Sequence, residues 1–248
     1  MWTVVLALLP VLLVSFFFSG FNAFRVLTIA LASALLTEMA MRKILGNRVT
    51  LYDGSATITA ILIALLVPST LPSWMIALGS AFGIVMGKEI FGGLGQNIFN
   101  PALVGVSFLL LSFPSAREIF LAPTQTLEIV VSIVTLLLGG VFLWTKRLIV
   151  WEIPLLYLGA VGLLSIVLIP AEINSLFSKP ILLAAFFIVT DPVTTPLTRT
   201  GSRRFALGAG LLTAAFRLAV GPAEALTSGI LLMNGLSPWL DRPFHPHR

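Results

Sequence analysis

The segment from Lys88 to Pro101 concentrates residue types that could hold a ligand, because three glycines are followed there by three amide side chains within an apolar chain. Glycines let the backbone approach a ligand or another helix closely, and amide side chains both donate and accept hydrogen bonds. With Lys88 as a nearby cation, this chemistry suits the ring edge or the phosphate of a cofactor. The candidate binding residues in this segment are Lys88, Gly92, Gly93, Gly95, Gln96, Asn97 and Asn100.

A tight turn that satisfies its own polar groups explains the same segment equally well. In that interpretation Asn100 caps the helix that Pro101 begins, since Asn is favoured at the N-cap and Pro at the first helical position. Lys88 then extends toward the lipid headgroups instead of binding a cofactor, and the same behaviour is favoured for Arg217, which ends a later apolar segment. Composition alone leaves both interpretations open.

Carboxylates form a second group of candidates. Asp53 and Asp191 each lie at the end of a short apolar segment, where a carboxylate could bind Na⁺ or H⁺ on an ion path. The favoured alternative is that each caps a helix, or pairs with Arg48 or Arg199 nearby. Glu38 and Glu128, within or beside apolar segments, are further ion-path candidates.

The composition of the chain shows which elements must carry these residues. Of 248 residues, 58% are hydrophobic and 10% are charged, whereas soluble domains carry roughly 25% charged residues. Since a spanning helix needs roughly 20 apolar residues, we expect an all-α polytopic membrane protein with about ten transmembrane helices. The predicted segments are roughly 2–19, 25–41, 56–68, 74–90, 101–113, 126–145, 149–169, 180–190, 204–219 and 223–240.

The basic residues predict the orientation. With ten spans, most Lys and Arg residues fall in the loops on the side of the N-terminus, so both termini are expected in the cytoplasm. The net charge of +5 is explained in this way and does not indicate nucleic-acid binding. The segment Met1–Phe18 lacks a basic start and a cleavage site, so we interpret it as the first span and not as a signal peptide.

The sequence offers few ligands for metals. It has no cysteine, which excludes disulfides and thiolate-held iron–sulfur clusters. Its two histidines, His245 and His247, lie in the terminal residues and indicate a solvated end, not a metal or haem site. We therefore predict no metal site.

An internal repeat is visible in the sequence. The Ala-Leu-Gly run at 77–79 precedes Lys88 by the same distance as the run at 206–208 precedes Arg217, and a glycine-containing break follows each cation. An odd number of spans separates the two units, which predicts inverted halves, roughly 1–113 and 126–240, within a single membrane domain. Chance similarity between apolar helices is the alternative. Inverted repeats with broken helices place binding sites near the membrane midplane.

The glycine- and amide-rich segment resembles a known family. Gly92–Pro101 is similar to the signature Gly-Gly-Leu-Gly-Gln-Asn-x-Phe-Asn-Pro of the D subunit of the Rnf electron-transport complex and of the related B subunit of the sodium-translocating NADH:quinone reductase. Thr190-Asp191-Pro192-Val193-Thr194 resembles the family's Thr-Asp-Pro-Val-Thr motif. Asp53–Ala56 and Leu231–Asp241 also fit, so the resemblance covers most of the chain.

The resemblance implies a membrane subunit of a redox-driven ion pump in the inner (plasma) membrane, and not a stand-alone enzyme. Such subunits carry flavin, pass electrons across the membrane and couple this to Na⁺ or H⁺ transport. Their fold is a bundle of two inverted five-helix halves, similar to ammonium and urea channels. The implied partners are other Rnf-type membrane subunits and an FMN-bearing extracytoplasmic subunit, and Thr190 and Lys88 join the implied flavin contacts.

One departure from the family concerns covalent flavin. Family members carry FMN on a threonine of a Ser-Gly-Ala-Thr-like motif in the loop after the fifth span, whereas the loop 112–126 of this chain has no such motif. No covalent FMN threonine is identified, neither Thr57 nor Thr124 nor Thr126. We expect non-covalent flavin, either riboflavin or FMN. The alternatives are a small-solute channel or transporter without redox activity, and a scaffold for redox partners.

Overall fold

A computed structural model describes residues 1–48, 51–120, 126–168 and 178–241, and within those ranges every regular element is a helix. The first part of the chain forms α1 (Trp2–Ser19), α2 (Phe21–Ile44), α3 (Ser55–Leu66), α4 (Ser73–Gly87), α5 (Pro101–Ser112) and α6 (Pro114–Phe120). The second part forms α7 (Thr126–Thr145), α8 (Glu152–Leu168), α9 (Lys179–Leu183), α10 (Arg199–Phe216) and α11 (Pro222–Leu240). Short 3₁₀ turns occupy Leu51–Asp53 and Glu89–Phe91, and a π-helical turn, Ala184–Ile188, continues α9.

In the part of the chain that the structure describes, four helices are long and apolar enough to cross a membrane: Trp2–Ser19, Phe21–Ile44, Ser73–Phe91 and Thr126–Thr145. A fifth span results if α5 and α6, which meet at an angle of 114°, are taken together. The chain is therefore a multi-pass membrane protein. Each of the ten predicted segments is helical, but several helices are short. The 12 residues of α3 extend about 18 Å, against about 30 Å of hydrocarbon, so the count of ten crossings stays a prediction.

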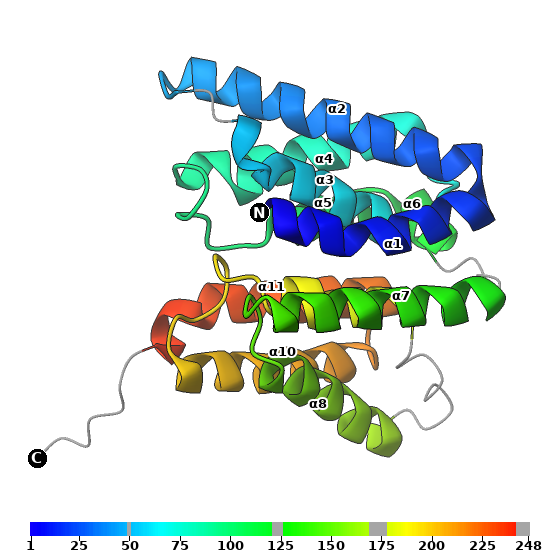
Figure 1. Cartoon of the computed structure of the whole chain (residues 1–248), viewed down its shortest axis with the longest axis vertical. Helices are drawn as coiled ribbons and strands as arrows, with labels where there is room; N and C mark the ends of the chain where they lie inside the picture. The colour runs from blue at the N-terminus through cyan, green and yellow to red at the C-terminus, as the bar shows by residue number, and fades with distance from the viewer. Residues whose placement is uncertain (49–50, 121–125, 169–177, 242–248) are drawn as a thin grey trace, which may run out of the picture.

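The helices form two groups that lie side by side (Figure 1). In the first group α4 packs closely against α2 and α5, and in the second group α10 packs closely against α8 and α11. Contact between the groups is made by α1 with α7 and by α5 with α11. We call residues 1–120 the first half and residues 126–241 the second half.

Glycines at four-residue spacing bring α4 and α5 together. A Cβ atom at Gly83 would lie 2.4 Å from the Pro101 carbonyl oxygen, and one at Gly87 would lie 2.7 Å from Pro101 Cα. Small residues at this spacing let membrane helices approach at the level of the backbone. This close approach fixes the start of α5 against the end of α4, so the connection 88–100 must form a compact loop between them.

Caps fix the ends of the broken helices. Asn100 Oδ1 accepts hydrogen bonds from the backbone N–H groups of Ala102 (3.1 Å) and Leu103 (3.3 Å), which confirms the predicted N-cap of α5. Asp53 Oδ1 accepts from the Ser55 backbone N–H (2.7 Å) and hydroxyl (2.5 Å) at the start of α3. Asp53 therefore bonds to the first residue of α3, although the N-cap residue of that helix is Gly54.

Candidate functional site

A cavity of about 240 Å³ lies between the two halves. Its walls come from the first residues of the chain, from α3, from the loop 88–101, from the end of α7 and from the segment 186–193. We call it the inter-half cavity. Its polar lining residues are Thr3, Ser55, Thr59, Lys88, Asn97, Asn100, Thr190 and Asp191. Its apolar lining includes Leu62, Leu143, Ile149, Phe186 and Phe187.

The cavity brings together residues that the sequence places about a hundred positions apart. Lys88, Asn97 and Asn100 come from the first half, whereas Thr190 and Asp191 come from the second. Two motifs that are separate in the sequence therefore meet at one site. The broken ends of the short helices create this meeting point, because unpaired backbone at membrane depth is tolerated where it lines a protected cavity.

The remaining predicted binding residues do not line the cavity. Gly92, Gly93 and Gly95 have φ values of 110°, 96° and 90°, a backbone conformation that L side chains rarely adopt. A Cβ atom at Gly93 would lie 2.6 Å from the Arg42 guanidinium, and one at Gly92 would contact the side chain of Gln96. These glycines serve the shape of the loop and the packing of Arg42 against it, and Gln96 is exposed.

Lys88 belongs to a buried network of four charges. Its Nζ lies 2.7 Å from Glu38 Oε1 and 3.8 Å from Glu89 Oε1. Arg42 Nε lies 3.4 Å from Glu38 Oε1 and 3.5 Å from Glu89 Oε2. The network is formally neutral, as buried charges must be to avoid a large desolvation cost. The snorkelling interpretation of Lys88 is wrong, since its side chain is 2% exposed and its ammonium points into the protein.

Ser55 connects this network to the start of α3. The Lys88 ammonium donates a hydrogen bond to Ser55 Oγ at 2.6 Å, and the Ser55 hydroxyl in turn donates to Asp53. Asp53 is therefore linked to the cavity through Ser55, although it does not line the cavity itself. Its proposed role on an ion path stays a prediction.

Asn97 lines the cavity and has a buried side-chain oxygen without a partner among the described residues. The residue is 6% exposed, and its Nδ2 donates to the Phe99 carbonyl oxygen at 3.3 Å. Its buried Oδ1 accepts no hydrogen bond from the part of the chain that the structure describes. Leaving a buried polar atom without a partner costs about 1–3 kcal/mol. A ligand with an N–H or O–H donor would remove that cost.

Asp191 closes the turn after the π-helical segment. Its carboxylate accepts hydrogen bonds from the Val193 backbone N–H (3.2 Å) and the Thr194 hydroxyl (3.1 Å). Thr190 donates to the Phe186 carbonyl oxygen at 2.7 Å. The predicted pairing of Asp191 with Arg199 is wrong, because Arg199 forms its ion pair with Glu152 at 2.5 Å.

Several cavity and network residues were not predicted as binding residues. Glu38 was predicted only as an ion-path candidate, and Arg42 was not predicted at all. Their four-residue spacing within an otherwise apolar helix was a usable signal, because charges in such helices pair with one another. Ser55 lies in the family-like segment Asp53–Ala56, but neither it nor Thr59 and Phe187 was singled out as a binding residue, since hydroxyl and aromatic residues are common in apolar segments. Only the packing of the halves assigns them to the cavity.

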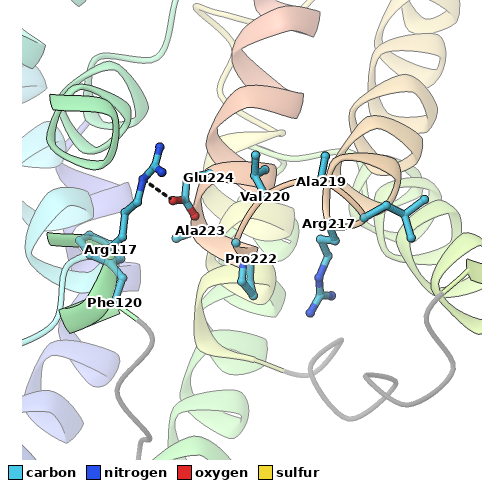
Figure 2. Close-up of a pocket in the computed structure, with 10 residues that line it drawn as sticks. Arg117, Phe120, Arg217, Ala219, Val220, Pro222, Ala223 and Glu224 are labelled. Carbon is cyan, nitrogen blue, oxygen red and sulfur yellow. Dashed lines mark ion pairs between the residues drawn. The ribbon is translucent and has the colours of Figure 1, made fainter. Parts of the chain in front are cut away.

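A second hollow of about 480 Å³ lies between α6, the end of α10 and the start of α11. Figure 2 shows Arg117 pointing toward Glu224, whereas Arg217 extends from the far side of the turn at Pro222. Arg117 Nε lies 3.0 Å from Glu224 Oε1 and donates to the Leu110 carbonyl oxygen at 2.9 Å. This ion pair ties the first half to the second. We predicted that Arg217 extends freely to the lipid headgroups. That prediction is wrong, because the residue is only 9% exposed.

Comparison with known proteins identifies the family. The family model for NQR2, RnfD and RnfE matches residues 1–130 and 116–248. The chain belongs to the NQR2, RnfD, RnfE family. The resemblance found in the Gly92–Pro101 and Thr190–Thr194 segments is thereby confirmed.

Relatives within the NQR2, RnfD, RnfE family have informative names. The chain is 34% identical to the D subunit of the Na(+)-translocating ferredoxin:NAD(+) oxidoreductase complex of Acetobacterium woodii, over 98% of this chain and 87% of that one. It is 31% identical to the proton-translocating counterpart of Clostridium ljungdahlii, over 99% and 89%. It is 32% identical to the D subunit of the ion-translocating oxidoreductase complex of Methanosarcina acetivorans, over 97% and 88%.

The first two alignments extend over 277 and 296 positions, more than the 248 residues of this chain. These family members therefore carry insertions relative to it. The shortened loop 112–126 is consistent with that difference. Of the threonines considered for covalent FMN, Thr57 and Thr126 do not line the inter-half cavity, and Thr124 lies outside the described residues. The two histidines, His245 and His247, also lie outside the described residues.

Proposed function

We propose that this protein is the D-type membrane subunit of an Rnf-type ion-translocating electron-transport complex, and that it holds a flavin non-covalently in the inter-half cavity. The observation that supports this most is the convergence of the two family motifs on one cavity. In this role the protein relays electrons across the membrane, coupled to Na⁺ or H⁺ transport. D-subunit relatives named for each ion exist, so the family does not decide the ion.

The cavity residues fit a flavin ring. Apolar walls at Leu62, Leu143 and Phe187 suit the faces of a planar ring system, and the free Oδ1 of Asn97 suits a ring N–H donor. Lys88 lines the cavity beside the ring, but its ammonium is already paired with Glu38. When bound, the flavin supplies one- and two-electron transfer.

The size and charge of the cavity limit what it holds. Its volume of about 240 Å³ lies below the roughly 300–1,000 Å³ of pockets for drug-sized ligands. A ring fits, but a ribityl or phosphate tail must extend out of it. Lys88 is already paired with Glu38 at 2.7 Å, so it is a poor phosphate anchor. We therefore expect binding in this cavity to rest on contacts with the ring.

The packing of the helices supports two inverted five-helix halves, roughly 1–113 and 126–240. The contacts of α4 with α2 and α5 correspond to those of α10 with α8 and α11. Across the interface, the first helices of the two halves, α1 and α7, contact each other, and so do the last helices, α5 and α11. The short α3 corresponds to α9 with its π-helical turn. We propose about ten crossings and a fold like that of ammonium and urea channels. The Lys and Arg distribution supports cytoplasmic termini in the inner membrane.

The proposed partners of this protein are the other membrane subunits of the complex and an FMN-bearing extracytoplasmic subunit. The names of its relatives support a multi-subunit complex. An electron relay needs donors and acceptors on both sides of the membrane.

An absorbance spectrum of the purified protein, before and after acid precipitation, tests the proposal. Non-covalent flavin gives absorbance in the native protein that moves to the supernatant on precipitation. Flavin that stays in the pellet would show covalent attachment and contradict the proposed binding mode. A protein without flavin, alone and in its complex, would overturn cofactor binding. Solute flux into liposomes without an electron donor would then favour a channel.

A further inference from the structure

We infer that Asn234 of α11 is a positioning residue that holds the two motif segments of the inter-half cavity in register. Asn234 is fully buried and lies outside the cavity lining. Its Oδ1 accepts a hydrogen bond from the Asn100 backbone N–H at 3.2 Å, and its Nδ2 donates to the Thr194 carbonyl oxygen at 2.9 Å. One amide side chain thus joins the loop of the first half to the turn of the second.

Each residue that bonds to Asn234 either lines the cavity or bonds to a residue that lines it. Asn100 lines the cavity and caps α5 through its own side chain. The Thr194 hydroxyl donates to the carboxylate of Asp191, which also lines the cavity. A shift of Asn234 would therefore displace the cavity wall on both sides.

The neighbouring glycine supports the same contact. A Cβ atom at Gly235 would lie 3.6 Å from the ring of Phe99, so the aromatic ring packs over α11 beside Asn234. Phe99 in turn accepts, at its carbonyl oxygen, the hydrogen bond from Asn97. The loop 97–100 therefore docks on α11 through a ring and a hydrogen bond together.

An amide suits the chemistry of the contact, because its oxygen and its nitrogen each bond to one of the two segments. A buried polar group in an apolar helix is unfavourable unless it is partnered, and α11 itself needs no side-chain hydrogen bond at this position. One partner is a donor and the other an acceptor, which only a group with both functions satisfies. Leucine has a similar size but would bond to neither backbone group.

Replacing Asn234 should affect the segment 97–103 and the segment 191–196 to different extents. Ser237 Oγ also donates to the Thr194 carbonyl oxygen, at 3.2 Å, so this oxygen keeps a donor when Asn234 is replaced. The Asn100 N–H has no second acceptor among the described residues. Loss of Asn234 should therefore loosen residues 97–103 more than residues 191–196.

Hydrogen–deuterium exchange of the full-length, flavin-free protein tests this inference. In Asn234→Leu, we expect exchange in peptides covering 97–103 to rise by about tenfold or more, since a buried hydrogen bond is lost, with a smaller rise in 191–196. The matched control is Thr227→Val in the same helix. Thr227 is also buried but bonds only within α11, to Ala223 and Glu224, so its exchange pattern should match wild type.

A second variant keeps the test decisive if the leucine variant fails to fold. Asn234→Asp retains an oxygen for the Asn100 N–H, so 97–103 should stay protected. Unchanged exchange in 97–103 of Asn234→Leu, or equal loosening in Thr227→Val, would overturn the inference.

Flavin binding provides a separate readout that rests on the proposed function. Asn234→Leu should weaken flavin affinity about tenfold, whereas Thr227→Val should not. If wild type binds no flavin, the proposed function fails, but the exchange data still decide the positioning role. If flavin binds and Asn234→Leu alters neither exchange nor affinity, only the positioning role fails.

Discussion

Replacing Glu38 by Gln should destabilise the protein strongly, because it removes one negative charge from the buried network of four. The Lys88 ammonium loses its partner at 2.7 Å, and its remaining carboxylate, Glu89 at 3.8 Å, is shared with Arg42 at 3.5 Å. Lys88 is 2% exposed and Glu38 is fully buried. Bulk water therefore cannot solvate the Lys88 ammonium in place of the lost carboxylate.

The expected cost follows from that burial. Breaking a buried ion pair by removing one partner costs about 3–5 kcal/mol. A glutamine carbonyl still accepts from Lys88, which places Glu38→Gln near the lower end, at about 3 kcal/mol. For a chain of 248 residues, each kcal/mol shifts Tm by about 2–4 °C, so a decrease of roughly 6–12 °C is expected.

Thermal and denaturant unfolding of the detergent-solubilised protein measures this effect. The double variant Glu38→Gln/Lys88→Met leaves the neutral pair of Arg42 and Glu89, and it should recover most of the lost stability, because a buried pair replaced as a whole costs little. Glu152→Gln is the matched control. Glu152 also contacts two arginines but is 30% exposed, so Glu152→Gln should lose much less stability than Glu38→Gln.

The reasoning is refuted if Glu38→Gln loses no more stability than Glu152→Gln. It is also refuted if the double variant is no more stable than the worse of its two single variants, since the charge imbalance would then not be the cause.

Three further predictions concern packing, pH and backbone conformation. Gly83→Ala should destabilise the protein by about 1–3 kcal/mol, since the new methyl would lie 2.4 Å from the Pro101 carbonyl oxygen; unfolding measures it. Burial raises the pKa of Asp241, but hydrogen bonds from the start of α10 outweigh it, and the pKa is lowered overall. Its stabilising contribution is therefore present above about pH 4 and lost as the pH falls further, which unfolding from pH 7 to pH 3 will show. Arg147→Gly should stabilise the protein by about 1 kcal/mol, because Arg147 has a φ of 57°, as a Tm comparison would reveal.

Each of these predictions has a control. A methyl group added at Gly159 would have no atom within 4 Å, so Gly159→Ala should be neutral or stabilising, and equal losses at both glycines would contradict the packing argument. Asp241→Asn should abolish the loss of stability that Asp241 causes below about pH 4. An unchanged pH profile would contradict the stabilising role of the hydrogen bonds from the start of α10 to Asp241. Lys146→Gly, at a neighbouring residue without a positive φ, should not stabilise the protein.

Much of the helical fold was predictable because local signals mark it. The ten apolar segments correspond to helices, and Pro101 after Asn100 correctly predicted the start of α5. Helix lengths were less predictable. The predicted segment 180–190 is a short α-helix followed by a π-helical turn, a change that depends on packing against α7 and α8 and has no signature in the apolar sequence.

The candidate site was only partly predictable, because it depends on contacts between distant segments. The sequence singled out Asn97 and Thr190 in separate motifs, and the family resemblance implied that both contact one flavin, but only the structure shows that both line one cavity. Glycine in the loop was predicted to allow close approach of a ligand or of another helix, and Gly93 accommodates Arg42 of α2. The glycines in the sequence predict that another group lies close to the loop backbone, but only the fold determines which group that is.

The most direct test of the central claim is flavin titration of two adjacent amide variants. Asn97 lines the inter-half cavity with a free Oδ1, whereas Gln96 is exposed and outside it. Flavin fluorescence quenching should show that Asn97→Leu weakens binding about tenfold or more, since the loss of a buried hydrogen bond is worth about 1–3 kcal/mol, and that Gln96→Leu binds like wild type. Equal affinities for both variants and wild type would contradict a flavin site in this cavity.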